Sequence, residues 1–558
     1  MSKPEQPKAE RKLKAMPYKK LIKTAQKFYD NEQWEEAAPY FMEVWHRHPD
    51  DKEILIVLAF LLSKLGVRAH AIALLEKALE VHGPTKDILA ILGDMASKME
   101  MHDIALQIYR ISTNEFPDDP MGYVNLASAL GSLDKHAESI SVLQQVIPHF
   151  PTNALMWNVL ASHVSVEHGP AAAVEFYEEA LRLDPDHYMA LNNLANVYLA
   201  FNDHQKAIET AERAHKAKPD HYEPLLLLGT LNMTVGNIVE GFEQYEARYD
   251  PRRPGTLLFH DLPPTWQGED LAGKNILVAN EQGLGDEVLF AVNLPSIMKQ
   301  AKKVFIGCDN RLVKLLERSF PGAKAVTSFT ADQEGYKIRV FPEISQGIQN
   351  GDFTVDYSIK AGSAPRYLWQ DVKDIPNYPD GFLIPDPNRV DYWKDQLDQV
   401  SDKPKVGIIW RSGMRNKYRD LAYTQIEDWA EIFENQGVTF VCLQYDDCSE
   451  EIAEAKEKYG VDIYLPKDLD QKNNIDDTCA LIKALDLVIG VSTAPAHMAN
   501  AVGTPVWWVL KALPWWYFGE TENSAICGNS RTFNGQNDPD WTPVIQSIAK
   551  QLKKEFPK

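Results

Sequence analysis

The chain has 558 residues, 44% of them hydrophobic and 25% charged, which are ordinary proportions for globular domains with buried cores. Its formal net charge of −21 argues against nucleic acid or an anionic membrane surface as the main partner. No apolar run approaches the ~18 residues of a membrane span, and five scattered cysteines form neither a disulfide framework nor a zinc motif, so we expect a cytoplasmic protein.

Residues 1–20 contain seven Lys or Arg and two Asp or Glu, with no apolar segment after the basic residues. They lack the apolar segment of a secretory signal and the composition of a folded core. We therefore predict that residues 1–20 form a disordered basic tail.

A repeat of about 34 residues follows the tail. Prolines recur at this spacing, and each is preceded by small residues about 24 and 12 positions earlier. Small side chains let two antiparallel helices approach closely, and proline ends each unit because it cannot continue a helix. The prolines are Pro49, Pro84, Pro117, Pro151, Pro185 and Pro219; the small residues are Ala25, Ala59, Gly93, Ala127, Ala161 and Ala195, then Ala37, Ala71, Ala105, Ser139, Ala173 and Ala207.

This pattern resembles the tetratricopeptide repeat (TPR) family. It predicts an α-solenoid over residues 21–250, with six repeats and a degenerate seventh. Such arrays stack into a superhelix whose concave groove binds peptides or proteins. The segment carries 17 Lys or Arg against 34 Asp or Glu. Its −17 charge favours a bound polypeptide segment that is basic or rich in hydrogen-bond donors.

The second half alternates short apolar runs with helical stretches, which is typical of parallel sheets covered by helices. Residues 251–272 are rich in proline and read as a linker, and residues 350–404 as a less regular stretch leading to a hinge. We predict two α/β lobes, residues 273–403 and 404–558, the second with a C-terminal helix. The predicted strands are 276–279, 304–307, 406–410, 440–443, 487–491 and 505–510, and the predicted helices are 287–300, 311–320, 425–435 and 478–485.

The first candidate site motif follows the strand at 276–279. Gly283 and Gly285 let the backbone turn tightly near a ligand, and Asp286 stands where a helix begins. Asp286 is interpreted either as a catalytic carboxylate or as a helix cap.

Two further motifs follow strands of the second lobe. Arg411 and Ser412 begin a loop that contains Lys417 and Arg419 and suits an anion, unless it is only a solvated basic loop. The run from Ser492 through Thr493, Ala494 and Pro495 to His497 predicts a helix N-terminus after a buried strand, where free N–H groups bind phosphate. His497 is interpreted either as a ligand-binding or as a structural histidine.

Together these stretches resemble a known family. Residues 241–248 (GFEQYEAR), 281–286 (EQGLGD) and 487–497 (LVIGVSTAPAH) resemble, in this order, bacterial TPR-containing glycosyltransferases related to the ADP-heptose heptosyltransferases. Ser492 stands where that family usually has Asp, and residues 410–413 also differ from its pattern, so the donor sugar is left open. The sequence around Arg411 is similar to TPR glycosyltransferases that modify flagellin.

The resemblance implies a GT-B fold and metal-independent, inverting sugar transfer, with a nucleotide-sugar as substrate and no cofactor. It implies that Asp286 is the general base and that Gly283, Gly285, Arg411, Ser412, Lys417, Arg419, Ser492, Thr493, Ala494 and His497 bind the donor. Trp515 or Trp516 is a candidate for stacking on the sugar or base. We expect a protein Ser or Thr acceptor, flagellin being one candidate, recruited by the repeats. The alternatives are a non-catalytic TPR scaffold with a degenerate transferase domain and a lipid or saccharide glycosyltransferase.

Overall fold

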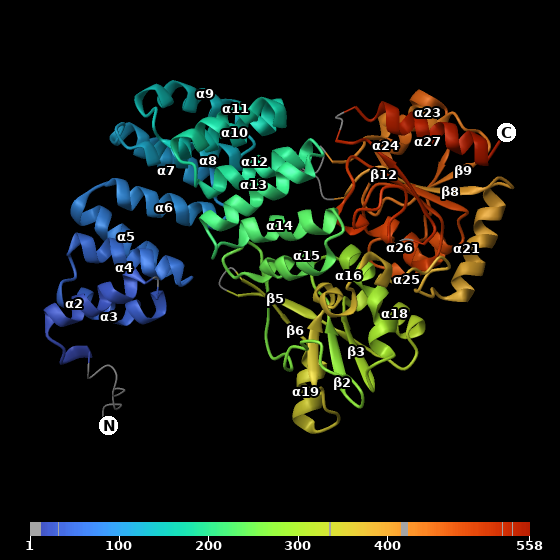
Figure 1. Ribbon diagram of the computed structural model, residues 1–558, viewed down its shortest axis with the longest axis horizontal. Helices are drawn as coiled ribbons and strands as arrows, with labels where there is room; N and C mark the ends of the chain where they lie inside the picture. The colour runs from blue at the N-terminus through green and yellow to red at the C-terminus, as the bar shows by residue number, and fades with distance from the viewer. Residues whose placement is uncertain are drawn as a thin grey trace. The chain divides into compact units, whose positions relative to one another are not determined.

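A computed structural model describes residues 13–31, 33–333, 336–413, 422–526, 528–537 and 540–557 (Figure 1). The chain divides into two compact units, Met1–Val197 and Tyr198–Lys558. The first unit is helical, and the second joins helices to parallel sheets, as the predicted α + α/β class requires. Within the described segments, no helix has the length and apolar character needed to cross a membrane.

The first unit consists of successive helical hairpins (Figure 1). Its helices are α2 (Tyr18–Asp30), α3 (Trp34–Arg47), α4 (Lys52–Lys64), α5 (Arg68–His82), α6 (Lys86–Lys98), α7 (His102–Glu115), α8 (Pro120–Ser132), α9 (His136–Val146), α10 (Ala154–His168) and α11 (Pro170–Leu183). Helix α12 (Tyr188–Ala200) contains the division between the units.

The small residues of the repeat lie where the two helices of a hairpin meet. Ala25, Ala59 and Ala127 are fully buried. A Cβ added to Gly93 would lie 2.4 Å from the ring of Tyr109, so the bulky residue of that repeat occupies the space that glycine leaves. The predicted small positions are confirmed at these residues, because close helix packing leaves no room for larger side chains there.

The second unit begins with the end of α12 and contains α13 (His204–Ala217), α14 (Tyr222–Thr234), α15 (Ile238–Tyr245) and the 3-10 turn η2 (Glu246–Tyr249). The last hairpin, α14 and α15, packs on the α/β part of the same unit: Phe242 lies 5.6 Å from the ring of Trp369 and 6.0 Å from that of Phe518. Residues 241–248 therefore attach the last repeat to the domain that follows it.

The first lobe is built on a parallel sheet of order β4-β3-β2-β7. The same lobe also contains a smaller sheet of order β1-β6-β5, in which β1 is parallel and β5 antiparallel to β6. The strands are β1 (Leu257–Phe259), β2 (Asn275–Ala279), β3 (Lys303–Cys308), β4 (Lys324–Thr327), β5 (Phe329–Gln333), β6 (Tyr336–Val340) and β7 (Tyr357–Lys360); the helices are α16 (Leu284–Phe290), α17 (Leu294–Met298), α18 (Val313–Ser319), α19 (Pro342–Asn350) and α20 (Pro365–Leu368).

The second lobe is built on a six-stranded parallel sheet of order β10-β9-β8-β11-β12-β13. Its core strand β8 is fully buried. The strands are β8 (Lys405–Ile409), β9 (Thr439–Cys442), β10 (Ile463–Tyr464), β11 (Leu487–Gly490), β12 (Val506–Leu510) and β13 (Ser530–Asn534); the helices are α21 (Pro387–Val400), α23 (Ala430–Phe433), α24 (Ser449–Tyr459), α25 (Ile475–Lys483), α26 (Ala494–Val502) and α27 (Thr542–Glu555).

All six predicted strands are present, but three other expectations need correction. The predicted helix 287–300 is two helices, α16 and α17, joined by a 3-10 turn before Pro295. The proline-rich linker 251–272 contains β1, which pairs with β6. The stretch 350–404 contains the 14-residue helix α21, which starts on Pro387 because proline is tolerated in a first helical turn.

Candidate active site

A cavity of about 530 Å³ lies at the carboxyl ends of β2 and β11, one strand from each lobe. Ligands of parallel α/β sheets bind at this edge, where the strand–helix loops gather. The cavity is lined by Gly283, Leu284, Gly285, Asp286, Leu289, Arg311, Ser412, Tyr423, Tyr445, Gln471, Lys472, Ile475, Ser492, Thr493, Ala494, Pro495, His497, Met498, Trp515 and Trp516. Eight of the eleven residues predicted from the sequence therefore surround one cavity.

Asp286 lies in the first turn of α16 and borders the cavity. Its Oδ2 accepts a hydrogen bond of 3.2 Å from the Gly283 N–H. Burial raises the pKa of Asp286, and the bond from Gly283 only partly offsets this. The carboxylate thus caps its own helix and also has the raised proton affinity that suits a general base.

The N-termini of α16 and α26 meet at the cavity. A Cβ added to Gly285 would lie 3.5 Å from Cα of Ala494, an ordinary van der Waals contact, so the two loops lie side by side at this point. Thr493 precedes α26 in an extended conformation and makes no side-chain bond to the helix N-terminus. The first N–H groups of a helix have no partner within it and favour an anion.

His497 lies inside α26, with its ring 5.1 Å from that of Trp508 and 5.2 Å from that of Trp516. Its Nε2 is 3.3 Å from the Ser492 hydroxyl, and its buried Nδ1 has no hydrogen-bond partner in the described part of the chain. Burial lowers the pKa of His497 to about 4. The imidazole is therefore neutral near pH 7 and can serve the site as a hydrogen-bonding group, not as a cation.

Arg411 differs from its predicted role. Its side chain is buried and forms ion pairs with Asp446 and Glu451, and it does not line the cavity. Its charge is compensated inside the lobe, where two carboxylates engage the guanidinium and it holds the loop after β9. Lys417 and Arg419 of the same predicted loop lie outside the described residues.

Two cations that the sequence analysis did not single out border the cavity instead. Arg311 pairs with Asp309 in the first lobe and donates a 2.8 Å hydrogen bond to the Lys472 carbonyl in the second. Lys472 itself is exposed. Arg311 lies shortly after the end of β3, as Arg411 lies after the end of β8. Its position after a strand is the sequence signal that could have identified Arg311 as a candidate.

Glu281 belongs to the motif at residues 281–286, and the sequence assigned it no role of its own. Its carboxylate accepts four hydrogen bonds. Its buried carboxylate accepts hydrogen bonds from Arg248, Tyr249 and the Gly362 N–H. Burial alone would raise its pKa, but Arg248 and these donors hold the pKa below its usual range. The pairing explains why residues 241–248 and 281–286 belong to one motif set.

Trp515 and Trp516, which follow β12, differ in burial. Trp516 is buried against His497, and Trp508 behind it is core, as predicted. Trp515 is half-buried and touches the rings of Tyr245 and Phe290, at 5.6 and 6.2 Å between centroids. Trp515 is therefore the tryptophan with a face available at the cavity edge.

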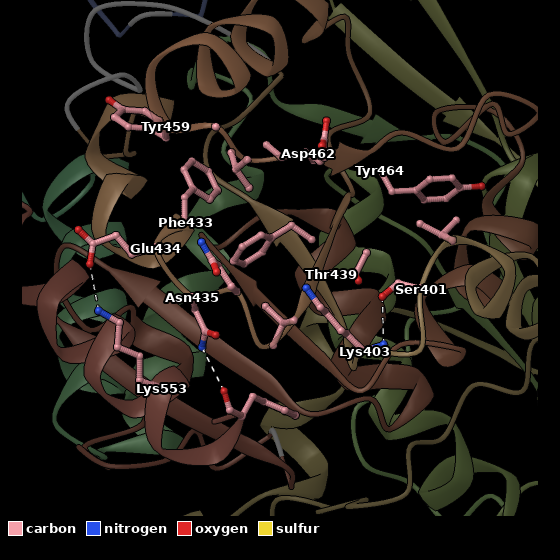
Figure 2. A pocket seen from close by; sticks show the side chains of 18 of the residues that line it. Ser401, Lys403, Phe433, Glu434, Asn435, Thr439, Tyr459, Asp462, Tyr464 and Lys553 are labelled. Atoms are coloured by element: carbon pink, nitrogen blue, oxygen red, sulfur yellow. Dashed lines mark hydrogen bonds and ion pairs between the residues drawn. The ribbon is translucent and has the colours of Figure 1, made fainter. Parts of the chain in front are cut away.

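A larger hollow, of about 1050 Å³, lies elsewhere in the second lobe (Figure 2). Figure 2 shows Thr439, Ser401 and Lys403 on one side and Lys553 bonded to Glu434 on the other. Thr439 is the first residue of β9, so this hollow lies at the amino ends of the strands. Loop residues that bind ligands gather at the opposite edge, and we assign the active site to the smaller cavity.

Comparison with known proteins matches two families to parts of the chain. The sequence pattern of the tetratricopeptide repeat family matches residues 167–222, and that of glycosyltransferase family 9 (heptosyltransferase) matches residues 386–508. Protein FlbA of Caulobacter vibrioides is 33% identical over 506 residues, which are 89% of this chain and 83% of FlbA.

Two solved structures with similarity to part of the chain are repeat proteins. YrrB, described as a TPR protein with an unusual peptide-binding site, is 20% identical and covers 33% of this chain and 95% of its own, with a TM-score of 0.25. A tetratricopeptide repeat protein from Parabacteroides merdae is 13% identical and covers 41% of this chain and 91% of its own, with a TM-score of 0.35.

Proposed function

Because the chain belongs to the family of TPR proteins that carry a family 9 glycosyltransferase domain, we propose that it transfers a sugar from a nucleotide-sugar to a Ser or Thr hydroxyl of a protein. The observation that carries the proposal is the cavity that joins Asp286 of one lobe to the N-terminus of α26 in the other. One side offers a half-buried carboxylate and the other offers N–H groups suited to a diphosphate.

The proposed reaction is a single displacement with inversion. The acceptor oxygen attacks the anomeric carbon as the bond from that carbon to the diphosphate oxygen breaks. Asp286 takes the hydroxyl proton, and the nucleoside diphosphate leaves with the bonding electron pair. The N-terminus of α26, together with Arg311 and Lys472, stabilises the charge that develops on the leaving group. Residues of the chain supply each of these interactions, so the proposal needs no metal ion.

The proposed protein acceptor follows from the repeats. A small sugar acceptor needs only the transferase cavity, whereas a long array of helical hairpins offers a surface suited to a polypeptide. Attachment of both parts in one chain raises the concentration of a docked segment near Asp286. Flagellin remains one candidate acceptor.

The test is nucleotide-sugar binding measured by calorimetry with a panel of UDP, GDP, ADP, dTDP and CMP sugars. One of them should bind the wild-type protein, and the double variant Arg311→Gln/Lys472→Gln should bind it about tenfold more weakly, since two charged contacts to phosphate are lost. The exposed Lys302→Gln is the matched control. Failure of every nucleotide-sugar to bind, or equal binding by the double variant, would contradict the proposal.

A further inference from the structure

A second cavity, of about 730 Å³, lies on the other side of the loop that carries Asp286. Four parts of the second unit line it: the last helical hairpin with the turn that follows it, the small sheet β1-β6-β5, the loop after β2, and the turn after β12. The lining residues are Leu226, Thr230, Tyr245, Arg248, Tyr249, Arg253, Gly255, Leu257, Glu281, Gln282, Thr330, Ala331, Lys337, Arg339 and Trp515.

The two cavities are neighbours. Glu281 and Gln282 line the second cavity, and the next four residues, Gly283 to Asp286, line the first. Trp515 lines both. Gln282 has a φ of 52° and donates a 3.0 Å hydrogen bond to the Tyr245 hydroxyl, which fixes the loop between them. A ligand in the second cavity is thus separated from Asp286 by one loop and one indole ring.

The second cavity is basic. Among the described residues, Arg253, Lys337 and Arg339 line it, and the one carboxylate among its described lining residues, Glu281, is already bonded to Arg248, Tyr249 and the Gly362 N–H. Arg339 donates to the Asn280 carbonyl and the Thr330 hydroxyl, and within the described part of the chain neither Arg253 nor Arg339 forms an ion pair with a carboxylate. Lys337 is exposed and stands opposite Asp332 in the β5–β6 register.

We propose that this cavity is an acceptor subsite that binds a carboxylate side chain next to the modified hydroxyl of the acceptor polypeptide. The assignment rests on the proposed function. The two half-buried arginines and the exposed Lys337 stand in a hollow also lined by aromatic rings, and such cations bind carboxylates with charge-assisted hydrogen bonds. The half-buried ring of Trp515 offers apolar surface for the adjoining peptide, whereas Arg248 and Lys360 cover the ring of Tyr249.

This subsite would separate two kinds of acceptor recognition. The acidic repeats favour a basic or donor-rich docking segment, whereas the cavity beside Asp286 favours an acidic residue close to the modified hydroxyl. An acceptor with both features would satisfy each part of the chain.

The experiment uses the full-length protein and three synthetic 13-residue peptides that share a central Thr and differ only in its two flanking residues, Asp, Asn or Lys. Peptide binding is measured by fluorescence anisotropy for the wild type and for Arg253→Gln/Lys337→Gln, with Lys302→Gln as the matched surface control. We expect the Asp peptide to bind wild type about tenfold more tightly than the Asn peptide, and the double variant to lose this preference.

Equal binding of the three peptides, or an unchanged preference in the double variant, would overturn the subsite. The donor is tested separately with UDP-glucose and UDP-glucuronate, which differ in one carboxylate. If the double variant weakens only UDP-glucuronate, the cavity holds a donor sugar and the acceptor assignment is wrong. Peptide preference without nucleotide-sugar binding would leave the subsite standing and contradict the proposed transferase reaction.

Discussion

The buried guanidinium of Arg248 and the buried carboxylate of Glu281 form a two-pronged ion pair, with N–O distances of 3.0 and 3.1 Å. Arg248 ends the last helical hairpin, and Glu281 opens the loop that leads to Asp286. The pair therefore couples the position of the candidate base to the hairpin, and Tyr249 and Ser363 extend the same network.

Replacing Arg248 with Met should lower the free energy of unfolding of the second unit by about 3–5 kcal/mol, because Glu281 would be left buried without its counter-charge. The measurement is urea denaturation followed by tryptophan fluorescence. Arg252→Met is the matched control, since Arg252 forms an exposed pair with Asp250 worth about 0–1 kcal/mol. Equal losses in the two variants would mean that the buried pair has no special role.

His497 gives a pH-dependent prediction. Burial lowers its pKa from 6.5 to about 4, so the unfolded chain binds its proton more readily than the folded chain. Its contribution makes the protein less stable as the pH falls from about 6.5 toward 4. His497→Gln should make the decline of the melting temperature between pH 7 and pH 5 shallower. Parallel declines in the two proteins would show that His497 is not held neutral.

His497 also bears on donor binding. A neutral ring offers one ordinary hydrogen bond, so donor affinity should not rise between pH 7.5 and pH 5.5, as it would if a histidinium met the diphosphate. Donor affinity is measured by calorimetry at a series of pH values between 7.5 and 5.5. A rise that disappears in His497→Gln would show that the protonated ring binds the donor.

Arg411 is expected to stabilise the second lobe. Arg411→Met leaves Asp446 and Glu451 without their cation, and we expect a fall in melting temperature with donor affinity within about threefold of wild type. Arg311→Gln is the comparison variant, because Arg311 lines the cavity and should weaken donor binding with a smaller effect on melting. The opposite order of effects would restore the phosphate role first predicted for Arg411.

Removal of residues 1–197 tests the role of the repeats. The remaining residues form the second compact unit and keep both cavities, so the fragment should bind and slowly hydrolyse nucleotide-sugar. It should no longer modify the protein acceptor that the full chain labels. Thermal melting controls for folding of the fragment. Equal labelling of protein by both forms, or labelling only of a lipid or saccharide fraction, would refute recruitment by the repeats.

The sequence predicted best what depends on local periodicity. Buried positions such as Ala59 and Ala127 follow from the repeat, and β8 and β11 follow from their apolar runs. Ion pairs between residues far apart in the sequence could not be predicted, because nothing near either residue indicates its partner. The partner of Arg411 is 40 residues away at Glu451, so a compensated buried cation looked like a free one. Arg248 and Glu281 are 33 residues apart and resembled ordinary surface charges.

In the second half, proline-rich stretches were predicted to be irregular, yet two of them contain regular secondary structure. Pro387 suggested a loop, but it begins α21, and the four prolines of 251–272 did not reveal β1. For the site, strand ends identified the loops of Gly283 and Thr493, because parallel strands bring their carboxyl ends to one edge. The second cavity depends on how the last hairpin packs, which no spacing along the chain encodes.

The most direct test of the account is the turnover of Asp286→Asn at saturating donor and acceptor. The amide can still cap Gly283 but cannot take a proton, so we predict a fall in kcat of at least about a hundredfold. Donor affinity should stay within a few-fold, and the melting temperature should not fall, since burial makes the ionised carboxylate costly. Near-normal turnover in a folded variant would contradict the account and leave Asp286 as a helix cap.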